Sequence, residues 1–453
     1  MATKATLLLL IISAGAIFAF QNCSGFSATS NAQLSLSSTS FWPTTETWQG
    51  AFTLAPGESV SAGDVQLGLS RKGVLTLTKA DEVLWAPVYN GNGVDPQTYR
   101  LRFLQDGSLT LLSGATGIWS NGISGTPGRR LKLLSAPPYL QITNSDSSVV
   151  WYPKVPLVFF SALDNVVQYA EGRKGVQDFD LLFGDGTGWS QGLKHVNVVQ
   201  FYAAFLRDAS DEKLLRIFRF LRSHRIALAM EIGLLKQGDD GCGAGLEGYV
   251  GTGTPLTITQ RIKALGGELS YVSIDESFIA TRKPDGCRAD VETAARQVAK
   301  KFNSLQAVFP GLMIGDTENL PTVLSNEFLD SYGKWVRAMN ADLKAPLAFF
   351  HHDIDWRNSD WPSVQNVNRA YVESLGLSYG PIFNAAAGST NDISWARSAK
   401  ANIDLFNSSF PAPDDLIFQN WDMFPSRALP ETDASTQTSV VRYYFSSKAG
   451  NKL

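Results

Sequence analysis

The chain has 453 residues, which is enough for two or three domains that each bury a hydrophobic core. Its formal net charge is −3 at pH 7, with neither a basic tract nor an acidic tail, which argues against nucleic-acid binding and against electrostatic attachment to a membrane. Aromatic residues make up 11% of the chain, a content that suits stacking against sugar rings.

Residues 1–23 have the pattern of a secretory signal. Lys4 precedes an apolar run that extends to about Phe20, and Cys23 follows. The run is too short and interrupted for a comfortable membrane span, so we expect export, either secretion or retention in the cell envelope. Cys23 resembles the lipidated cysteine of a bacterial lipoprotein, which would anchor the protein to a membrane; ordinary cleavage is the alternative. Residues 24–44 are rich in Ser, Thr, Ala and Asn and are predicted to form a flexible linker.

Three segments of similar sequence follow, and each ends on a tryptophan. The segments are residues 67–85, 101–119 and 131–151. Alternating apolar positions, a tight turn and a second alternating run are typical of a β-hairpin, followed here by a third strand that carries the tryptophan. One hairpin cannot bury its apolar face alone. We therefore expect the three hairpins to share a core in which Trp85, Trp119 and Trp151 meet.

On this repeat and its tryptophan, residues 45–153 resemble the bulb-type lectins, and residues 56–63 add to the resemblance. The resemblance implies an all-β β-prism fold. Lectins of this family bind mannose through a Gln-x-Asp-x-Asn-x-Val-x-Tyr pocket in each repeat. In the second repeat only Asp106 matches, Ser108 replaces the Asn, and the other repeats keep none of the pattern. The lectin pocket is therefore degenerate, and a structural β-module or a module for another ligand is the alternative.

Strand patterns alternate with helical patterns from residue 155 to residue 453. The predicted strands are Pro156–Ala162, Val196–Leu206, Ile226–Leu235, Leu269–Ser277, Leu312–Glu318, Leu347–Asp355, Leu377–Ala385 and Leu416–Phe424. The predicted helices are Asp211–His224, Asp290–Phe309, Asn326–Leu343, Val364–Leu375 and Ile393–Phe406. Eight strands that alternate with helices over about 300 residues predict an α/β domain, a (β/α)8 or TIM barrel.

Active sites of this fold lie at the carboxyl ends of the strands, and here those ends are acidic. The strand-end acids are Glu231 on the third strand, Asp275 and Glu276 on the fourth, Glu318 on the fifth and Asp353 on the sixth. Because side chains alternate between the two faces of a strand, Glu231, Asp275 and Asp353 are expected to point inward. Asp355 is placed inward by the same reasoning. Several carboxylates should therefore converge on one mouth; helix capping or ion pairing is the alternative for each.

Converging carboxylates are what glycoside hydrolysis requires, because one group protonates the leaving oxygen while another attacks the anomeric carbon or activates water. The barrel resembles the glycosidase barrels, which implies an acid at Glu276 and an aromatic platform at Trp421. The large retaining group has its nucleophile at the end of strand seven, where this chain has no carboxylate. A group with acids on strands four and six implies Asp275 and Asp353 instead. The catalytic candidates are therefore Glu276 or Asp275 as one group, Asp353 as the other, and Glu231 and Glu318 in support.

Polar and aromatic residues near the same mouth are candidates for substrate binding. They are His351, Asp355, Trp356, Gln419, Trp421 and Trp189. For the tryptophans, packing beneath long loops is the alternative to stacking on sugars. Because successive strand residues point to opposite faces, His351 and His352 are not expected to share an ion, so we predict neither a metal site nor another cofactor.

Cys242 follows the third predicted strand and Cys287 follows the fourth, so both lie in adjacent loops on the same face of the barrel. In an oxidising compartment this pair is a disulfide candidate. The sequence as a whole predicts an exported multidomain protein that hydrolyses a polysaccharide or glycan in the barrel, with the prism as a targeting domain. A non-catalytic carbohydrate-binding surface protein and a metal-dependent hydrolase are the alternatives.

Overall fold

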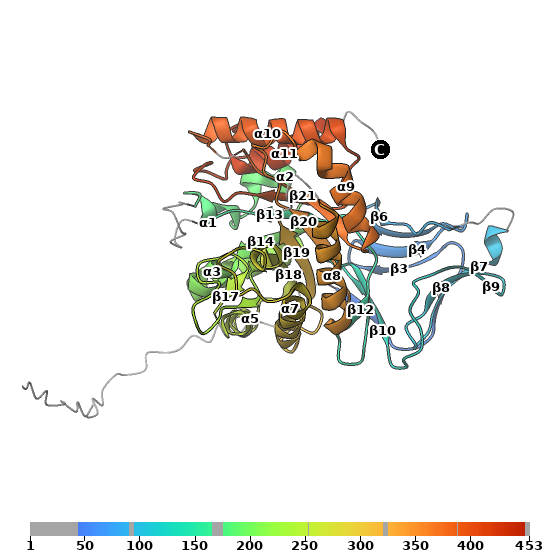
Figure 1. The fold of residues 1–453 in the computed structure, drawn as a ribbon. Coiled ribbons are helices and arrows are strands. Elements are labelled where there is room, and N and C mark those ends of the chain that lie inside the picture. The colour runs from blue at the N-terminus through green and yellow to red at the C-terminus, as the bar shows by residue number, and fades with distance from the viewer. Residues whose placement is uncertain are drawn as a thin grey trace, which may run out of the picture. The chain divides into compact units, whose positions relative to one another are not determined.

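Three antiparallel sheets of four strands each make up the chain from Thr45 to Trp151 in the computed structural model (Figure 1). The strands are β1 (Thr45–Trp48), β2 (Phe52–Leu54), β3 (Glu58–Ala62), β4 (Val65–Leu69), β5 (Leu75–Lys79), β6 (Glu82–Trp85), β7 (Tyr99–Phe103), β8 (Leu109–Ser113), β9 (Thr116–Ser120), β10 (Arg130–Leu134), β11 (Leu140–Thr143) and β12 (Val149–Trp151). The sheet orders are β3-β4-β5-β6, β2-β7-β8-β9 and β1-β10-β11-β12. We call these three sheets the prism.

The structure describes residues 44–89, 95–164, 175–251, 253–319, 325–386 and 388–448. The predicted signal, Cys23 and nearly all of the predicted linker lie outside the described residues. The described residues belong to one compact unit, Phe41–Leu453. Among them, no helix is long and apolar enough to cross a membrane.

The prism is closed by apolar side chains at alternate strand positions, as the repeats predicted. In β4, for example, Val65, Leu67 and Leu69 are buried while the residues between them are not. The three tryptophans meet as expected: the ring centroids of Trp85 and Trp119 are 5.5 Å apart, and each lies 6.2 or 6.5 Å from that of Trp151. All three contacts are edge to face, the arrangement that aromatic quadrupoles favour.

The second part of the chain is a closed barrel of eight parallel strands. In barrel order they are β13 (Val158–Ser161), β14 (Val198–Tyr202), β15 (Ala227–Ile232), β18 (Leu269–Asp275), β19 (Met313–Glu318), β20 (Phe349–His352), β21 (Ser378–Phe383) and β22 (Leu416–Gln419). Every predicted strand therefore exists. Several end earlier than predicted: β20 stops at His352, three residues before the predicted end.

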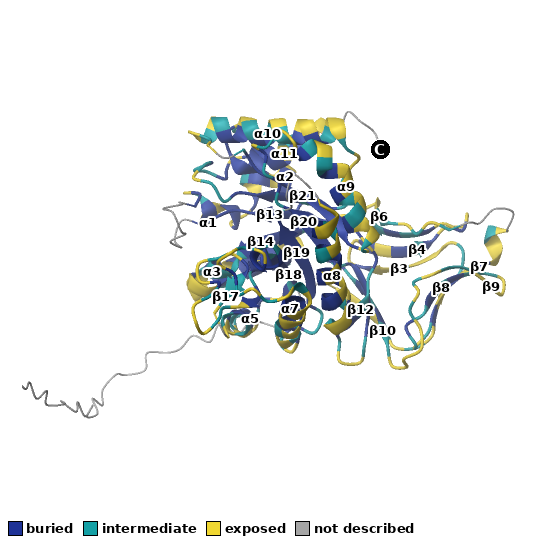
Figure 2. Cartoon of the chain, in the orientation of Figure 1, coloured by how far each residue is buried: buried dark blue, intermediate teal, exposed yellow. Residues whose placement is uncertain are grey.

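Helices cover the outside of the barrel. They are α1 (Phe179–Leu182), α2 (Ser190–Leu193), α3 (Ala203–Asp208), α4 (Asp211–His224), α5 (Thr254–Ala264), α6 (Ser277–Ala280), α7 (Val291–Gln306), α8 (Asn326–Asp342), α9 (Trp361–Ser374), α10 (Asp392–Ser409) and α11 (Gln437–Lys448). All five predicted helices are present. The long helices α5 and α11 were missed, as were the short helices α1, α2, α3 and α6. The second predicted strand, Val196–Leu206, was wrong at its end, because β14 stops at Tyr202 and α3 begins at Ala203. Each long helix buries one face, as Figure 2 shows for α7 and α10, whose outer faces are yellow and inner faces blue.

Aromatic side chains fill the lower interior of the barrel. The rings of Phe159, Tyr271 and Phe349 lie with centroids 5.5 to 6.2 Å apart. Gly315 on β19 also faces this interior, because a Cβ at that position would lie 2.0 Å from a ring atom of Phe349. The barrel is therefore packed rather than hollow at this level, so a cavity that opens at the carboxyl ends of the strands has this aromatic layer as its floor.

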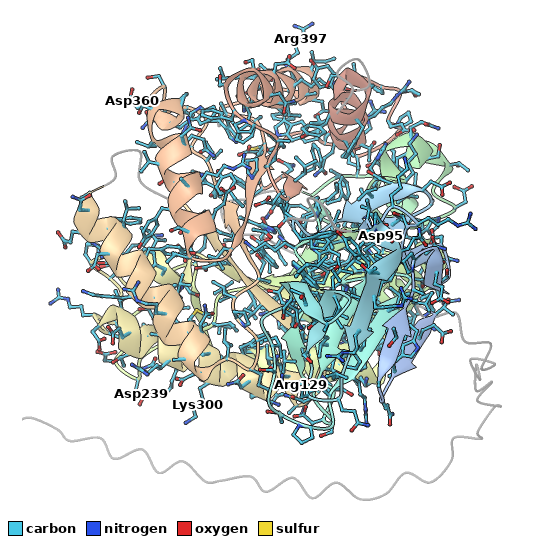
Figure 3. All side chains as sticks on the ribbon, turned by 90° about the vertical axis from the view of Figure 1, so that its right-hand side faces the viewer. Asp95, Arg129, Asp239, Lys300, Asp360 and Arg397 are labelled. Atoms are coloured by element: carbon cyan, nitrogen blue, oxygen red, sulfur yellow. A yellow bond between two sulfur atoms is a disulfide. The ribbon has the colours of Figure 1, made fainter. Side chains whose placement is uncertain are left out.

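Hydrogen bonds also join prism residues to barrel residues. Asn197, which precedes β14, donates to the Tyr139 hydroxyl at 3.0 Å, and Arg225 pairs with Asp64 at 2.6 Å. Many charged side chains project into solvent; Figure 3 labels Asp239, among others, as an example. Acidic residues of the barrel mouth do not follow this surface pattern; Glu231, for example, is 4% exposed.

Candidate active site

A cavity of about 170 Å³ at the carboxyl ends of the barrel strands is lined by five acidic residues. We call it the acid cavity, and its acids are Glu231, Glu247, Asp275, Glu276 and Asp353. Four of the five predicted catalytic residues are thus brought together. Among the described residues that line the cavity there is no Lys or Arg. The carboxylates are therefore crowded without a cation in the wall to balance them.

The alternation of side chains between the two faces of a strand directs two of these acids into the barrel. On β15, Met230 and Ile232 pack into the outer hydrophobic core, which leaves Glu231 between them facing the interior. On β18, Val272 and Ile274 pack outward in the same way, so that Asp275 faces inward. Both placements were predicted from the alternation of apolar residues.

Glu276 reaches the cavity through an unusual backbone conformation. Its φ is +44°, in the left-handed region that residues with a Cβ seldom adopt. The backbone N–H of Glu276 donates a hydrogen bond to the Thr317 carbonyl at 2.8 Å, which stabilises this conformation. The Glu276 carboxylate accepts a hydrogen bond from Lys283 Nζ at 2.8 Å. Strained residues of this kind are concentrated at functional sites, where the surrounding structure stabilises them.

Two glutamine amides hold Glu231. Gln200 Nε2 donates to Glu231 Oε2 at 2.6 Å, and Gln419 Nε2 donates to the same oxygen at 2.7 Å. Gln419 Nε2 also lies 2.7 Å from the Tyr202 hydroxyl. Gln419 was predicted to bind substrate. It does line the cavity, but its amide N–H group donates a hydrogen bond to Glu231. Gln200 and Tyr202 were missed, although they alternate with the apolar Val199 and Phe201 in the sequence.

Burial sets the protonation of the cavity. Desolvation, reinforced by the charges of neighbouring carboxylates, raises the pKa of Glu231 to about 8 and that of Asp353 to about 7. The same two causes raise the pKa of Asp275 well above its usual range. Because these groups interact, their protons are lost in steps that belong to the cluster. Near neutral pH the acid cavity therefore retains protons that isolated carboxyls would have lost.

Glu318 does not line the cavity, contrary to its predicted role. Thr317 is the β19 residue that faces the cavity, so that its neighbours Asp316 and Glu318 face the helices. Glu318 accepts hydrogen bonds from the N–H groups of Phe278 and Ile279 at the start of α6, at 2.6 and 3.0 Å. It is a helix cap, the alternative that applied to every strand-end acid.

His351 is likewise not at the mouth. It was predicted to bind substrate there, but its ring lies in the barrel core, with centroid distances of 4.5 Å to Phe159 and 4.2 Å to Phe349. Burial lowers its pKa to about 3, so the ring is neutral. His352 faces the opposite way, and its Nδ1 lies 2.8 Å from the Tyr379 hydroxyl. The two histidines therefore do not share a site.

A second cavity of about 180 Å³ adjoins the first and shares Asp353 and Trp421 with it. Asp355 lines this adjoining cavity and not the acid cavity, since β20 has already ended and the chain has turned. Its carboxylate binds Arg357, with Nε at 2.9 Å. The prediction that Asp355 points into the barrel was wrong for this reason.

The predicted tryptophans have different surroundings. Trp421 lines both cavities and is partly exposed, so it is available for stacking. Trp356 lines the adjoining cavity, but its ring is fixed by a hydrogen bond that Nε1 donates to the Ile382 carbonyl at 3.1 Å. Trp189 is fully buried against Phe160 and is a core residue, contrary to its predicted place at the mouth.

Cys242 and Cys287 form the predicted disulfide. It ties the loop that carries Glu247 to the loop that follows Lys283. The Tyr249 hydroxyl reinforces the junction by accepting from the Cys287 N–H at 2.9 Å. Glu247 was missed because its place in the cavity depends on this loop and not on a strand. Among the described residues, no group of three or more His, Cys, Asp or Glu side chains is placed to hold a metal ion.

The degenerate lectin pocket is occupied by turn hydrogen bonds. The N–H and hydroxyl of Ser108 both donate to Asp106 Oδ1, at 2.9 and 2.7 Å, and Gly107 between them has a φ of +88°. Asp146 and Ser148 make the same bonds in the third repeat. The matched Asp106 is thus explained by the hairpin turn between β7 and β8.

No family model matches this chain, and no curated protein matches it. Among solved structures, a monomeric monocot mannose-binding lectin from Gastrodia elata is similar at 18% identity, covering 24% of this chain and 94% of the lectin, with a TM-score of 0.21. Polygonatum cyrtonema lectin complexed with monomannoside is similar at 20% identity, covering 24% and 93%, with a TM-score of 0.19. A D-psicose 3-epimerase solved in the presence of D-fructose is similar at 11% identity, covering 59% and 94%, with a TM-score of 0.33.

Proposed function

We propose that the chain hydrolyses glycosidic bonds of a glycan that binds in the acid cavity. The observation that carries the proposal is the meeting of five carboxyl groups in one cavity that has no cationic residue in its described wall. Such crowding costs stability, and it has no structural purpose comparable to the helix cap of Glu318. It is what acid–base chemistry at a glycosidic oxygen needs.

The two catalytic roles are assigned to Asp353 and to Glu276 or Asp275. Asp353, whose pKa is raised to about 7 by burial and then by neighbouring carboxylates, holds a proton for the leaving oxygen near neutral pH. Glu276 is paired with Lys283 and is the better candidate for the ionised partner that attacks the anomeric carbon or activates water. Asp275 lies beside it as the alternative partner.

Trp421 supports a sugar ligand. Its partly exposed ring lies between the two cavities, where it can contact the apolar face of a sugar ring. We further propose that the chain is exported through residues 1–23, with Cys23 as the lipidation candidate, and that the prism, residues 45–153, targets the barrel to its glycan.

The test is reducing-end release from a panel of polysaccharides by the mature protein and by Asp353→Asn, Glu276→Gln and Asp275→Asn. The proposal expects release by the wild type and a loss of at least about a hundredfold in Asp353→Asn and in one of the other two. Asp316→Asn is the matched control. Asp316 is a buried acid of the neighbouring strand, bonded to Tyr332 and Trp335 outside the cavity, so its replacement should leave release intact.

A non-catalytic carbohydrate-binding protein is the second candidate. The observation in its favour is Asn384, just after β21, where the large retaining glycosidases have their nucleophile. Its Oδ1 accepts from Trp395 Nε1 at 3.0 Å, so the residue serves packing. Binding of a panel polysaccharide by all variants without release by any would establish this function and overturn hydrolysis.

A further inference from the structure

The carboxyl group of Glu231 has one oxygen engaged and one free. Its Oε2 accepts from both Gln200 Nε2 and Gln419 Nε2, whereas Oε1 has no hydrogen-bond partner among the described residues. Glu231 is 4% exposed and lines the acid cavity. A carboxyl oxygen that accepts no hydrogen bond from the described residues, in a residue that lines a cavity, is directed at whatever occupies that cavity.

The two amides determine which oxygen carries the proton when Glu231 is neutral. An oxygen that accepts two N–H groups has its lone pairs engaged and has no room for a hydrogen of its own on that side. A hydrogen on Oε2 would point at the N–H groups of Gln200 or Gln419. The proton therefore belongs on Oε1, the free oxygen.

The orientation of the amides follows from their mutual contact. Gln200 Nε2 lies 3.4 Å from Gln419 Oε1 as well as 2.6 Å from Glu231 Oε2. Turning over the Gln200 amide would set its oxygen against the oxygen of Gln419, and turning over Gln419 would set two NH₂ groups against each other. The arrangement that gives every close contact a donor and an acceptor is the one with both NH₂ groups toward Glu231.

Burial and neighbouring charge keep this proton in place. Desolvation raises the pKa of Glu231 to about 8, and the charges of Glu247 and Asp353 act in the same direction. The two amide bonds oppose the shift, because they favour the carboxylate. Burial outweighs them, so the group is mostly protonated at neutral pH.

We propose that Glu231 is a fixed hydrogen-bond donor to the substrate, with its proton on Oε1 and with Gln200 and Gln419 as the positioning residues. The partner is an acceptor oxygen of the bound sugar, a hydroxyl or an ether. This role rests on the proposed function for the identity of the ligand. The protonation and the geometry of Glu231 do not depend on it and are tested separately.

The first experiment is an infrared titration of the carboxyl region, recorded as the difference between the wild-type protein and Glu231→Gln. It needs no ligand. The expected difference is a protonated-carboxyl band that is present at neutral pH and disappears with a midpoint near pH 8. A carboxylate band already present at neutral pH would overturn the proposal. Asp316→Asn serves as a comparison, because Asp316 on β19 is a buried carboxyl outside the acid cavity whose pKa is also raised by burial, to about 7.

The second experiment separates a donor from a catalytic carboxylate. In Glu231→Gln the side-chain oxygen can accept from Gln200 and Gln419 while the NH₂ group faces the cavity, so a donor is retained. We expect its KM on the panel polysaccharide that the wild type hydrolyses fastest to stay within about threefold, and Glu231→Leu to raise KM at least about tenfold. Equal and severe loss of kcat in both variants would show a catalytic carboxylate and overturn the donor role.

The positioning residues have a readout of their own. Gln419→Leu removes an N–H donor that favours the carboxylate, so the infrared midpoint of Glu231 should rise above that of the wild type, together with KM. An unchanged midpoint would remove Gln419 from this role. The two proposals can fail separately. If no polysaccharide is hydrolysed but the infrared titration shows a protonated Glu231, the proposed hydrolysis is wrong and the protonation of Glu231 stands. If a polysaccharide is hydrolysed but Glu231 is ionised at neutral pH, the donor role of Glu231 is wrong and the proposed hydrolysis stands.

Discussion

Lys283 Nζ lies 2.8 Å from Glu276 Oε2, at the edge of the acid cavity. The pair joins a residue in a left-handed turn after β18 to a loop that the disulfide at Cys287 restrains. A positive charge is thereby kept beside one carboxylate of the cluster without entering the described wall of the cavity. Glu276 is in this way distinguished from Asp275, Asp353 and Glu231.

Lys283→Met is expected to lower reducing-end release about tenfold, because the charge that balances Glu276 is lost. The lysine side chain is 38% exposed, so the melting temperature should change by only a few degrees. Lys283→Arg, which keeps the charge, is the control and should retain most of the activity. Wild-type release by Lys283→Met would contradict the assignment of Glu276 as the ionised partner.

The rate of hydrolysis should fall as the pH rises above about 7. Asp353, with a pKa of about 7, then loses the proton that the leaving oxygen requires. The measurement is kcat against pH between about 5 and 9. A rate that rises throughout this range would show that Asp353 acts as a base and not as the acid.

Stability should also fall with rising pH. The folded-state pKa values of Glu231, Asp353 and Asp316, about 8, 7 and 7, exceed their ordinary values of 4.5, 3.8 and 3.8. The folded protein therefore binds more protons than the unfolded chain between these limits, and the stabilisation present at low pH is lost as pH rises through the folded values. Thermal unfolding between about pH 5 and 8 should show a declining melting temperature, with a shallower decline in Asp316→Asn. A rising melting temperature over this range would contradict the prediction.

Trp421 and Trp189 should respond in opposite ways to truncation. Trp421→Ala removes a cavity wall and should raise KM about tenfold, with a small effect on stability. Trp189→Ala empties a fully buried site and should cost about 3–5 kcal/mol in the free energy of unfolding. Kinetics and urea unfolding of the two variants measure this contrast. A raised KM in Trp189→Ala together with an unchanged KM in Trp421→Ala would contradict the assignment of Trp421 to ligand contact and of Trp189 to the core.

The double variant Cys242→Ser, Cys287→Ser should lose about 2–4 kcal/mol of stability, because the unfolded chain is no longer restrained by a link across 45 residues of sequence. Release should fall as well, since the loops that carry Glu247 and Lys283 lose their common restraint. Reduction of the wild-type protein with dithiothreitol is the matched measurement and should reproduce both effects. Full activity after reduction would show that the loops hold their positions without the bond.

The sequence predicted those features that depend on periodicity. The alternation of apolar residues on β15 and β18 was enough to predict that Glu231 and Asp275 face the barrel interior. It gave no guidance on β19, where Asp316, Thr317 and Glu318 are all polar and nothing marks the inward face. The predicted inward direction of Asp355 was wrong for a different reason. The strand β20 ends at His352, and side chains beyond the end of a strand no longer alternate between its two faces.

Features that depend on tertiary contacts could not be read in advance. Glu247 reaches the cavity from a loop whose path is set by the disulfide and by Tyr249. Trp189 follows a glycine-rich stretch and looks like a loop residue, yet its ring is buried against Phe160. The meeting of the prism tryptophans was predictable because it followed from the repeat itself.

The sharing of strands between repeats has a consequence for the order in which the prism is assembled during synthesis. β1 pairs with β10, joining Thr45 to Leu134, and β2 pairs with β7. Strands made first therefore remain without partners until the second and third repeats have emerged. The prism cannot be completed one repeat at a time, and a chain cut after the second repeat would leave the first strand with an unmatched edge.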